Sequence, residues 1–215
     1  MRTLIVSGGT IEEDFALDYI QKIQPEYIIA ADRGMEFCYR KKIMPDCIIG
    51  DYDSVDPSVY RYFRGRSRIE WHDLIPEKDD TDTQIAVDVA MEKGSRQVCL
   101  LGATGTRLDH VMGNLHLLKR MYEAGTEAFL VDACNRIRLV SGELILRRSE
   151  QFGSYVSILP FEGRLSHVTL TGMKYPLEDA DMETDNTLGI SNEITGESAE
   201  ICIGDGLALV VEARE

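Results

Sequence analysis

Short apolar runs alternate with helical patterns through the first two thirds of the chain, and this alternation constrains the fold more than any other feature. Strand, helix and strand in succession are typical of βαβ units, whose strands pair in parallel. The clearest helical patterns cover Thr81–Lys93 and His110–Ala124. We predict six strands here, at Thr3–Ser7, Tyr27–Ala31, Cys47–Gly50, Arg68–Trp71, Gln97–Leu101 and Ala128–Val131.

After about Asn135 the pattern changes to short β-rich segments separated by Gly, Ser and Pro. The strands expected there are Ile137–Val140, Glu143–Leu146, Tyr155–Leu159, Arg164–Leu170, Ala199–Ile203 and Leu207–Val211. No convincing helix follows, so we expect a small antiparallel sandwich or barrel. The predicted architecture is therefore an α/β domain with a mostly parallel, Rossmann-like sheet over residues 1–140, and a small all-β sandwich over residues 141–215.

Acidic residues dominate the charge of the chain. The 215 residues include 37 acidic and 23 basic ones, which gives a formal net charge of −14. Sequence-independent binding to nucleic acid or to an anionic membrane surface is therefore disfavoured. From Tyr175 onward there are eleven acidic residues and one basic residue, Arg214, so most of the net acidity belongs to the last fifth of the chain.

The cysteines and the lengths of the apolar runs indicate in which cellular compartment the protein is expected. Five cysteines, an odd number, are widely spaced within apolar runs, which is typical of reduced core residues rather than of disulfides or a zinc site. The run Leu4–Val6 is too short for the apolar part of a signal peptide. No stretch approaches the ~20 apolar residues of a membrane span. We therefore expect a cytoplasmic protein.

Two predicted strands end in aspartates. Asp32 follows Tyr27–Ala31, and Asp51, Asp53 and Ser54 follow Cys47–Gly50. In open α/β sheets, ligands bind outside the carboxyl ends of the strands. Two aspartates one residue apart can share a cation, and such oxygen ligands suit magnesium. An isolated Asp-x-Asp is more often a turn or a helix cap, however.

Two further loops have the chemistry of phosphate binding. The segment 77–82 places Lys78, Thr81 and several acids before a helix, whose first N–H groups can hold phosphate oxygens. Gly102–His110 offers small residues for close backbone approach and Arg107 for phosphate oxygens. The latter is neither a Walker A sequence nor a complete dinucleotide fingerprint. Together, however, these loops share one sheet edge and favour a magnesium–nucleotide phosphotransfer site.

The ordered set of motifs resembles the thiamine pyrophosphokinase (thiamine diphosphokinase) family. The matching elements follow the family's order and cover nearly the whole chain: Ala31–Gly34, Gly50–Ser54, Lys78-Asp79 with Thr81-Asp82, Gly102–His110 with Asn114, Leu170–Leu177 and Gly189–Asn192. The chain departs from the usual pattern at Arg33, where many members have Gly, and at Thr106, where Gly usually precedes the Arg.

The resemblance implies transfer of a diphosphoryl group from ATP to the hydroxyethyl oxygen of thiamine, with release of AMP. It implies a catalytic α/β domain, a β-sandwich that helps to bind thiamine, and a homodimer with active sites between subunits. It assigns catalysis to Asp51, Asp53, Asp82, Lys78 and Arg107, and Mg²⁺ to Asp51, Asp53, Asp82 and Asp32. ATP contacts fall on Asp32, Ser54, Asp79, Thr81, Thr104, Gly105, Arg107, Asp109, His110 and Asn114, and thiamine contacts on Ser191 and Asn192.

Three other interpretations remain open from the sequence. A pyrophosphokinase for another acceptor, such as a hydroxymethylpterin, would share the catalytic aspartates, although the Gly189–Asn192 element favours thiamine. A non-catalytic regulator could bind a nucleotide or thiamine diphosphate on the same scaffold. A structural or interaction module would instead use the acidic C-terminal segment.

Overall fold

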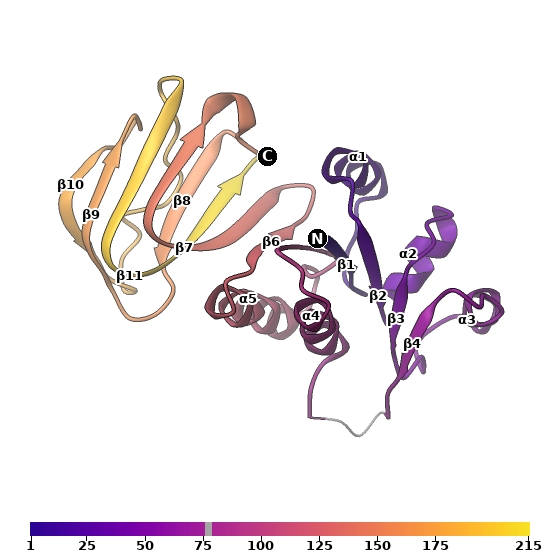
Figure 1. Cartoon of the computed structure of the whole chain (residues 1–215). Coiled ribbons are helices and arrows are strands. Elements are labelled where there is room, and N and C mark those ends of the chain that lie inside the picture. Colours follow the sequence, from indigo (N-terminus) through magenta and orange to yellow (C-terminus); the bar gives the residue numbers. More distant parts are fainter. Residues whose placement is uncertain (76–78) are drawn as a thin grey trace. The chain divides into compact units, whose positions relative to one another are not determined.

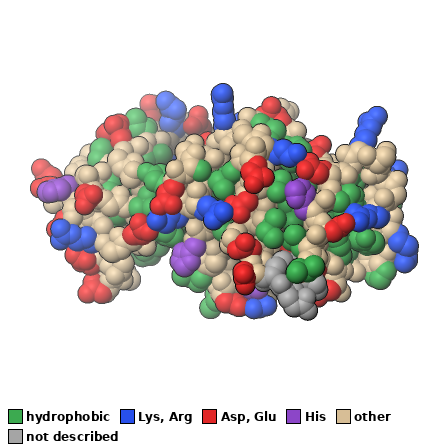
Figure 2. All heavy atoms as spheres, turned by 60° about the horizontal axis from the view of Figure 1, so that its bottom comes forward, with side chains coloured by type: hydrophobic (Ala, Val, Ile, Leu, Met, Phe, Trp, Pro, Cys, Tyr) green, Lys and Arg blue, Asp and Glu red, His purple; other side chains and the backbone are tan. Residues whose placement is uncertain are grey.

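The computed structural model describes residues 1–75 and 79–215. The chain divides into two compact units, Met1–Ala133 and Cys134–Glu215 (Figure 1). None of the helices in the described part of the chain is long and apolar enough to cross a membrane. On the face drawn in Figure 2, acidic side chains are interspersed with basic ones, so that face carries no continuous basic surface.

The first unit alternates strands and helices, as the sequence predicts. The strands in its described residues are β1 (Arg2–Val6), β2 (Tyr27–Ala31), β3 (Cys47–Gly50), β4 (Glu70–Asp73), β5 (Gln97–Leu101) and β6 (Glu127–Val131). Its helices are α1 (Glu13–Ile23), α2 (Gly34–Arg40), α3 (Pro57–Arg64), α4 (Asp82–Glu92) and α5 (Leu108–Glu123). Helix α3 begins at an ordinary cap: the Asp56 carboxylate accepts from the Ser58 N–H at 2.7 Å, and Pro57 occupies the first helical position.

All strands of the first unit pair in parallel, in the order β6-β5-β1-β2-β3-β4. Helices α4 and α5 lie on one face of the sheet, and α2 and α3 lie on the other (Figure 1). The apolar runs of the central strands are completely buried between these layers, for example at Leu4, Ile29 and Ile48. The strand order reverses direction between β1 and β5, and such a switch point is where open α/β sheets bind ligands.

The fourth strand lies two residues later than the predicted Arg68–Trp71. A turn holds the preceding residues, in which the Ile69 N–H donates to the Arg66 carbonyl at 3.4 Å. Parallel pairing then starts with Glu70 opposite Cys47 and ends with Asp73 opposite Gly50. The neighbouring strand β3, rather than the local apolar pattern, therefore sets the bounds of β4.

The second unit is an antiparallel β-sandwich. It consists of β7 (Asn135–Arg147), the short 3₁₀ helix η1 (Arg148–Glu150), β8 (Tyr155–Pro160), β9 (Leu165–Thr171), β10 (Leu177–Met182) and β11 (Ser198–Ala213). One edge of β11 pairs with β7, and its other edge pairs first with β9 and then with β8. Apolar side chains of all five strands form one buried core. This arrangement confirms the predicted fold class.

The predicted strands of this unit differ from the observed ones in two ways. Two pairs are each a single strand: Ile137–Val140 with Glu143–Leu146 in β7, and Ala199–Ile203 with Leu207–Val211 in β11. Left-handed glycines, Gly142 in β7 and Gly206 in β11, bend these strands at a bulge without ending them. Strand β10 was not predicted, because its sequence is rich in acids that rarely favour strands.

Candidate metal and phosphate site

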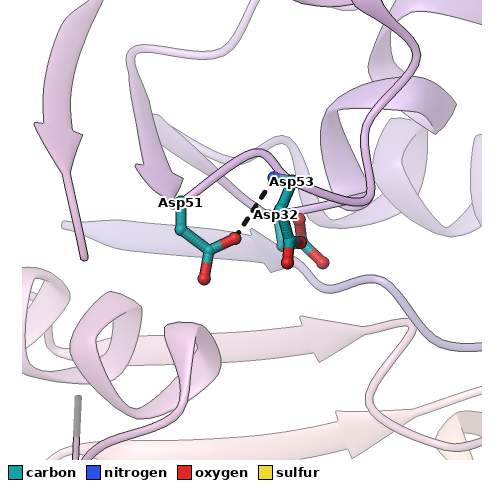
Figure 3. A group of neighbouring side chains, drawn as sticks. All are labelled: Asp32, Asp51 and Asp53. Carbon is teal, nitrogen blue, oxygen red and sulfur yellow. Dashed lines mark hydrogen bonds between the residues drawn. The ribbon is translucent and has the colours of Figure 1, made fainter. Parts of the chain in front are cut away.

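Three carboxylates converge at the carboxyl ends of β2 and β3. Asp32 follows β2, and Asp51 and Asp53 follow β3, which pairs beside it. One oxygen from each carboxylate lies within 4.8 Å of one from each of the others. Figure 3 shows the three carboxylates on the same side of the loop, and the Asp53 N–H donates to Asp51 Oδ1 at 3.3 Å. Three of the four aspartates predicted to hold a cation therefore lie together at adjacent strand ends, and the fourth, Asp82, is not part of this group.

The surroundings of Asp32 shift the pKa of its carboxyl group in opposite directions. Burial raises the pKa of this carboxyl, and the neighbouring Asp82 and Asp51 charges raise it further. The Ser54 hydroxyl opposes this by donating to both carboxylate oxygens of Asp32, at 3.0 Å each. Three closely spaced carboxylates of like charge are a donor set that fits a hard divalent cation such as Mg²⁺.

Next to these carboxylates, the first unit contains a cavity of about 620 Å³. Loops after β1, β2, β3 and β5 line it together with the first turns of α4 and α5. It therefore lies at the switch point of the sheet. Among the predicted site residues, the lining includes Asp32, Asp51, Thr81, Asp82, Thr104, Gly105, Arg107, His110 and Asn114.

The loops after β1 and β5 approach each other too closely for side chains. The Gly9 N–H donates to the Gly102 carbonyl at 2.8 Å, and the Thr10 N–H donates to the Thr104 carbonyl at 2.9 Å. A Cβ atom at Gly9 would collide with both carbonyl oxygens. The loop Ser7–Thr10 lines the cavity, although the sequence prediction missed it. A glycine pair directly after an apolar strand was the signal that could have identified it.

The two helices at the cavity are fixed by local hydrogen bonds. Thr81 caps α4, where its hydroxyl accepts from the Gln84 N–H at 3.2 Å. Asn114 on α5 is buried, and its Nδ2 donates to the Ala103 carbonyl at 2.7 Å. Asn114 therefore holds the loop after β5 against the helix.

Among the other residues that the sequence assigns to the nucleotide, Arg107 lines the cavity and several do not. Arg107 pairs with Asp109, with 2.5 Å between Nη2 and Oδ2, and both side chains are exposed. Arg107 lowers the pKa of Asp109, and Asp109 raises the pKa of Arg107, because each charge stabilises the other. Asp53, Ser54, Asp79 and Asp109 are not among the described residues that line the cavity. Lys78 lies outside the described residues.

In the second unit, Asn192 fixes the segment around Tyr175. Asn192 is buried, its Oδ1 accepts from the Tyr175 N–H at 2.9 Å, and its Nδ2 donates to the Tyr175 carbonyl at 2.7 Å. Ser191 has a left-handed backbone, and its N–H donates to Ser157 Oγ at 3.0 Å. The structure thus gives Asn192 a supporting role, and the contacts of both residues with thiamine remain predictions.

A parallel α/β sheet with a glycine-walled cavity at its switch point, and with a carboxylate cluster at the neighbouring strand ends, is typical of the nucleotide-dependent phosphotransferases. The comparisons with known proteins narrow this class. Residues 21–130 match the family model "Thiamin pyrophosphokinase, catalytic domain", and residues 143–207 match "Thiamin pyrophosphokinase, vitamin B1 binding domain". The chain therefore belongs to the thiamine pyrophosphokinase family, as its motifs predict.

Individual relatives agree with the family models. The chain is 30% identical to thiamine pyrophosphokinase of Bacillus subtilis (strain 168) over 188 residues, which are 87% of each chain. A crystal structure of thiamine pyrophosphokinase from Bacillus subtilis matches with a TM-score of 0.89, 27% identity and complete coverage of both chains. One from Geobacillus thermodenitrificans matches with a TM-score of 0.86 and 28% identity, over 100% of this chain and 98% of the other.

Proposed function

We propose that this chain transfers the diphosphoryl group of ATP to thiamine, which gives thiamine diphosphate and AMP. The observation that carries the proposal is the convergence of Asp32, Asp51 and Asp53 beside a cavity whose glycine-rich walls suit phosphate. Membership of the thiamine pyrophosphokinase family supports the nature of the donor and the acceptor. The same membership favours thiamine over a pterin alcohol and an enzyme over a binding protein.

In this proposal the carboxylates of Asp32, Asp51, Asp53 and Asp82 hold one or two Mg²⁺ ions. When bound, Mg²⁺ neutralises phosphate charge and stabilises the departing AMP. The backbone of the glycine loops and the start of α4 bind phosphate oxygens. Arg107 exchanges its partner Asp109 for a phosphate oxygen, and Lys78 adds a second positive charge.

Further roles in the proposal rest on the family resemblance. The first unit, Met1–Ala133, is the catalytic domain, and the second unit, Cys134–Glu215, is the thiamine-binding domain, in which Ser191 and Asn192 contribute to the acceptor site. ATP contacts come from Ser54, Asp79, Thr81, Thr104, Gly105, Asp109, His110 and Asn114. The chain works in the cytoplasm as a homodimer with active sites between subunits, and sedimentation equilibrium would test its oligomeric state.

A coupled assay tests the reaction. The protein is incubated with ATP, MgCl₂ and thiamine, and AMP and ADP are separated by chromatography. We expect AMP and thiamine diphosphate in equal amounts, no product in EDTA and none with Asp53→Asn. Formation of ADP would indicate phosphoryl transfer instead. A product with hydroxymethylpterin but not with thiamine would refute the choice of acceptor.

A further inference from the structure

Tyr52, which separates Asp51 from Asp53, has an unusual backbone. Its φ angle is 64°, in the left-handed region that residues other than glycine rarely adopt. Surrounding structure must compensate for such a conformation, which is often found at functional sites. The left-handed backbone of Tyr52 must therefore be stabilised by contacts other than those with the neighbouring carboxylates.

The left-handed turn determines where Asp53 lies. An extended Tyr52 would carry the chain onward by about 3.3 Å per residue, along the direction of β3. Instead the chain turns: the Val55 N–H donates to the Tyr52 carbonyl at 3.3 Å, and the Asp53 N–H donates to Asp51 Oδ1 at 3.3 Å. The turn thus keeps the Asp53 carboxylate near those of Asp51 and Asp32.

An aromatic cluster holds the Tyr52 side chain in place. The ring centroid of Tyr52 lies 5.5 Å from that of Trp71, edge to face, and 5.3 Å from that of Tyr60. Its hydroxyl donates to the His72 carbonyl at 3.2 Å. The Arg64 guanidinium lies 4.3 Å from the centroid of the Trp71 ring and 5.7 Å from that of Tyr60, so a cation–π contact joins both rings.

Arg64 is itself fixed. Its Nη2 lies 2.6 Å from Asp73 Oδ2, at the end of strand β4. Helix α3 and strand β4 therefore jointly hold the ring of Tyr52, and both elements lie outside the loop that bears the aspartates. The contacts that hold the Tyr52 ring thus come from elements outside the loop Asp51–Asp53.

We infer that Tyr52 is a positioning residue for the metal site: packing of its ring on Trp71 and Tyr60 fixes the left-handed turn and hence the spacing of the Asp51 and Asp53 carboxylates. This inference rests on the proposed function, because it assumes that these carboxylates bind Mg²⁺. Residues that orient metal ligands from outside typically change metal affinity by about 10- to 100-fold when replaced.

Metal binding can be measured without turnover. Calorimetric titration with Mn²⁺, in the absence of ATP and thiamine, reports affinity at the carboxylates. Trp71 is the only tryptophan of the chain, so its fluorescence offers a second signal of movement in the cluster. The Mg²⁺ concentration that gives half-maximal AMP release is a third measurement.

Four variants separate the possible roles of Tyr52. Tyr52→Phe keeps the ring and removes the hydroxyl. Tyr52→Gly removes the ring but adopts the left-handed conformation readily, and Tyr52→Ala removes the ring and keeps the backbone strain. The control is Tyr62→Ala, which deletes a partly exposed ring of the same helix region that does not contact Tyr52 in the described cluster. Circular dichroism and thermal unfolding check that each variant folds.

We expect Tyr52→Phe and the control to bind Mn²⁺ within about twofold of the unchanged protein, and Tyr52→Gly to bind at least about 10-fold more weakly. Tyr52→Ala should lose at least as much. Unchanged affinity in a folded Tyr52→Gly variant would overturn the inference, because the ring would then be dispensable. Equal losses in Tyr52→Phe and Tyr52→Gly would also overturn it, because the hydroxyl rather than the ring would hold the turn.

The two proposals can fail separately. If the unchanged protein binds Mn²⁺ and the Tyr52 series behaves as expected, but ADP is the product, the proposed function fails and the positioning role stands. If AMP is formed and Tyr52→Gly matches the unchanged protein in Mn²⁺ affinity, the positioning role alone fails. A protein that binds no Mn²⁺ at these carboxylates would overturn both.

Discussion

Replacement of Asp53 by Asn should stabilise the metal-free protein while it removes catalysis. Asp53, Asp51 and Asp32 place three like charges within 4.8 Å of one another when no cation is present. Asn has nearly the same shape and keeps the backbone N–H that donates to Asp51 Oδ1. The substitution therefore removes repulsion without removing the hydrogen bond that shapes the loop.

The size of the effect follows from Coulomb's law. Asp53 is exposed, so the dielectric constant of water applies, and two unit charges 4.8 Å apart then repel by about 0.9 kcal/mol. Asp53 takes part in two such pairs, which sum to about 1.7 kcal/mol, and salt screening reduces this sum to about 1 kcal/mol. At ~2 to 4 °C for each kcal/mol in a chain of this size, the midpoint of thermal unfolding should rise by about 2 to 4 °C.

Thermal unfolding followed by circular dichroism in EDTA measures this shift. Asp18→Asn is the matched control, because it removes an exposed carboxylate of helix α1 that is not part of the cluster. Addition of Mg²⁺ at a hundred times the dissociation constant should reverse the order of stability, because binding then stabilises the unchanged protein by about 2.7 kcal/mol and Asp53→Asn by much less. AMP release should be lost in the variant.

Salt provides a further check, since 0.5 M NaCl should reduce the difference between Asp53→Asn and the unchanged protein in EDTA. A variant that unfolds at a lower temperature than the unchanged protein in EDTA would refute the reasoning, because the carboxylates would then be paired rather than repelling one another. An equal shift in Asp18→Asn would show that the effect comes from the net charge and not from the cluster.

Three further predictions concern other parts of the molecule. Gly9→Ala should lower ATP affinity at least about 10-fold, because its Cβ collides with carbonyl oxygens of the loop after β5; fluorescent-nucleotide titration measures this. Lys93 and His72 lower the pKa of Glu70 to about 2, so its carboxylate stabilises the fold above pH 4.5, and this contribution is lost as the pH falls toward 2. In urea unfolding measured across this pH range, the free energy of unfolding of Glu70→Gln should therefore fall less with decreasing pH than that of the unchanged protein. Asn192→Ala leaves backbone groups of Tyr175 unpaired and should lower the free energy of unfolding by about 1 to 3 kcal/mol; unchanged stability in urea would contradict the supporting role of Asn192.

The carboxylate cluster was predictable from the sequence for a simple geometric reason. Neighbouring parallel strands end at the same edge, so residues that directly follow β2 and β3 lie close together whatever the loops do later. The same reasoning places Thr104, Gly105 and Asn114 beside them, after β5. The local sequence pattern and the parallel topology are therefore sufficient to predict which residues form this part of the site.

Other features depend on contacts that no local pattern encodes. The role of Ser7–Thr10 follows from hydrogen bonds to a loop almost a hundred residues away. The pairing of Arg107 with Asp109 joins two exposed side chains, whose orientations the sequence does not determine. The bounds of β4 depend on its register with β3. Strand β10 forms despite its acidic residues because β9 supplies the pairing edge.

The charges that line the cavity explain how an acidic chain can bind ATP. Among the described lining residues, Asp32, Asp51 and Asp82 are anionic, whereas Arg33 and Arg107 are cationic. Arg107 is paired with Asp109, so the positive charge left for phosphate is small. Free ATP would therefore meet net repulsion, while a bound divalent cation reverses the local sign. In the proposed reaction, the nucleotide therefore needs a metal ion at the carboxylates, whereas the metal ion can bind there before the nucleotide, and the carboxylates provide selectivity for the metal complex over the bare nucleotide.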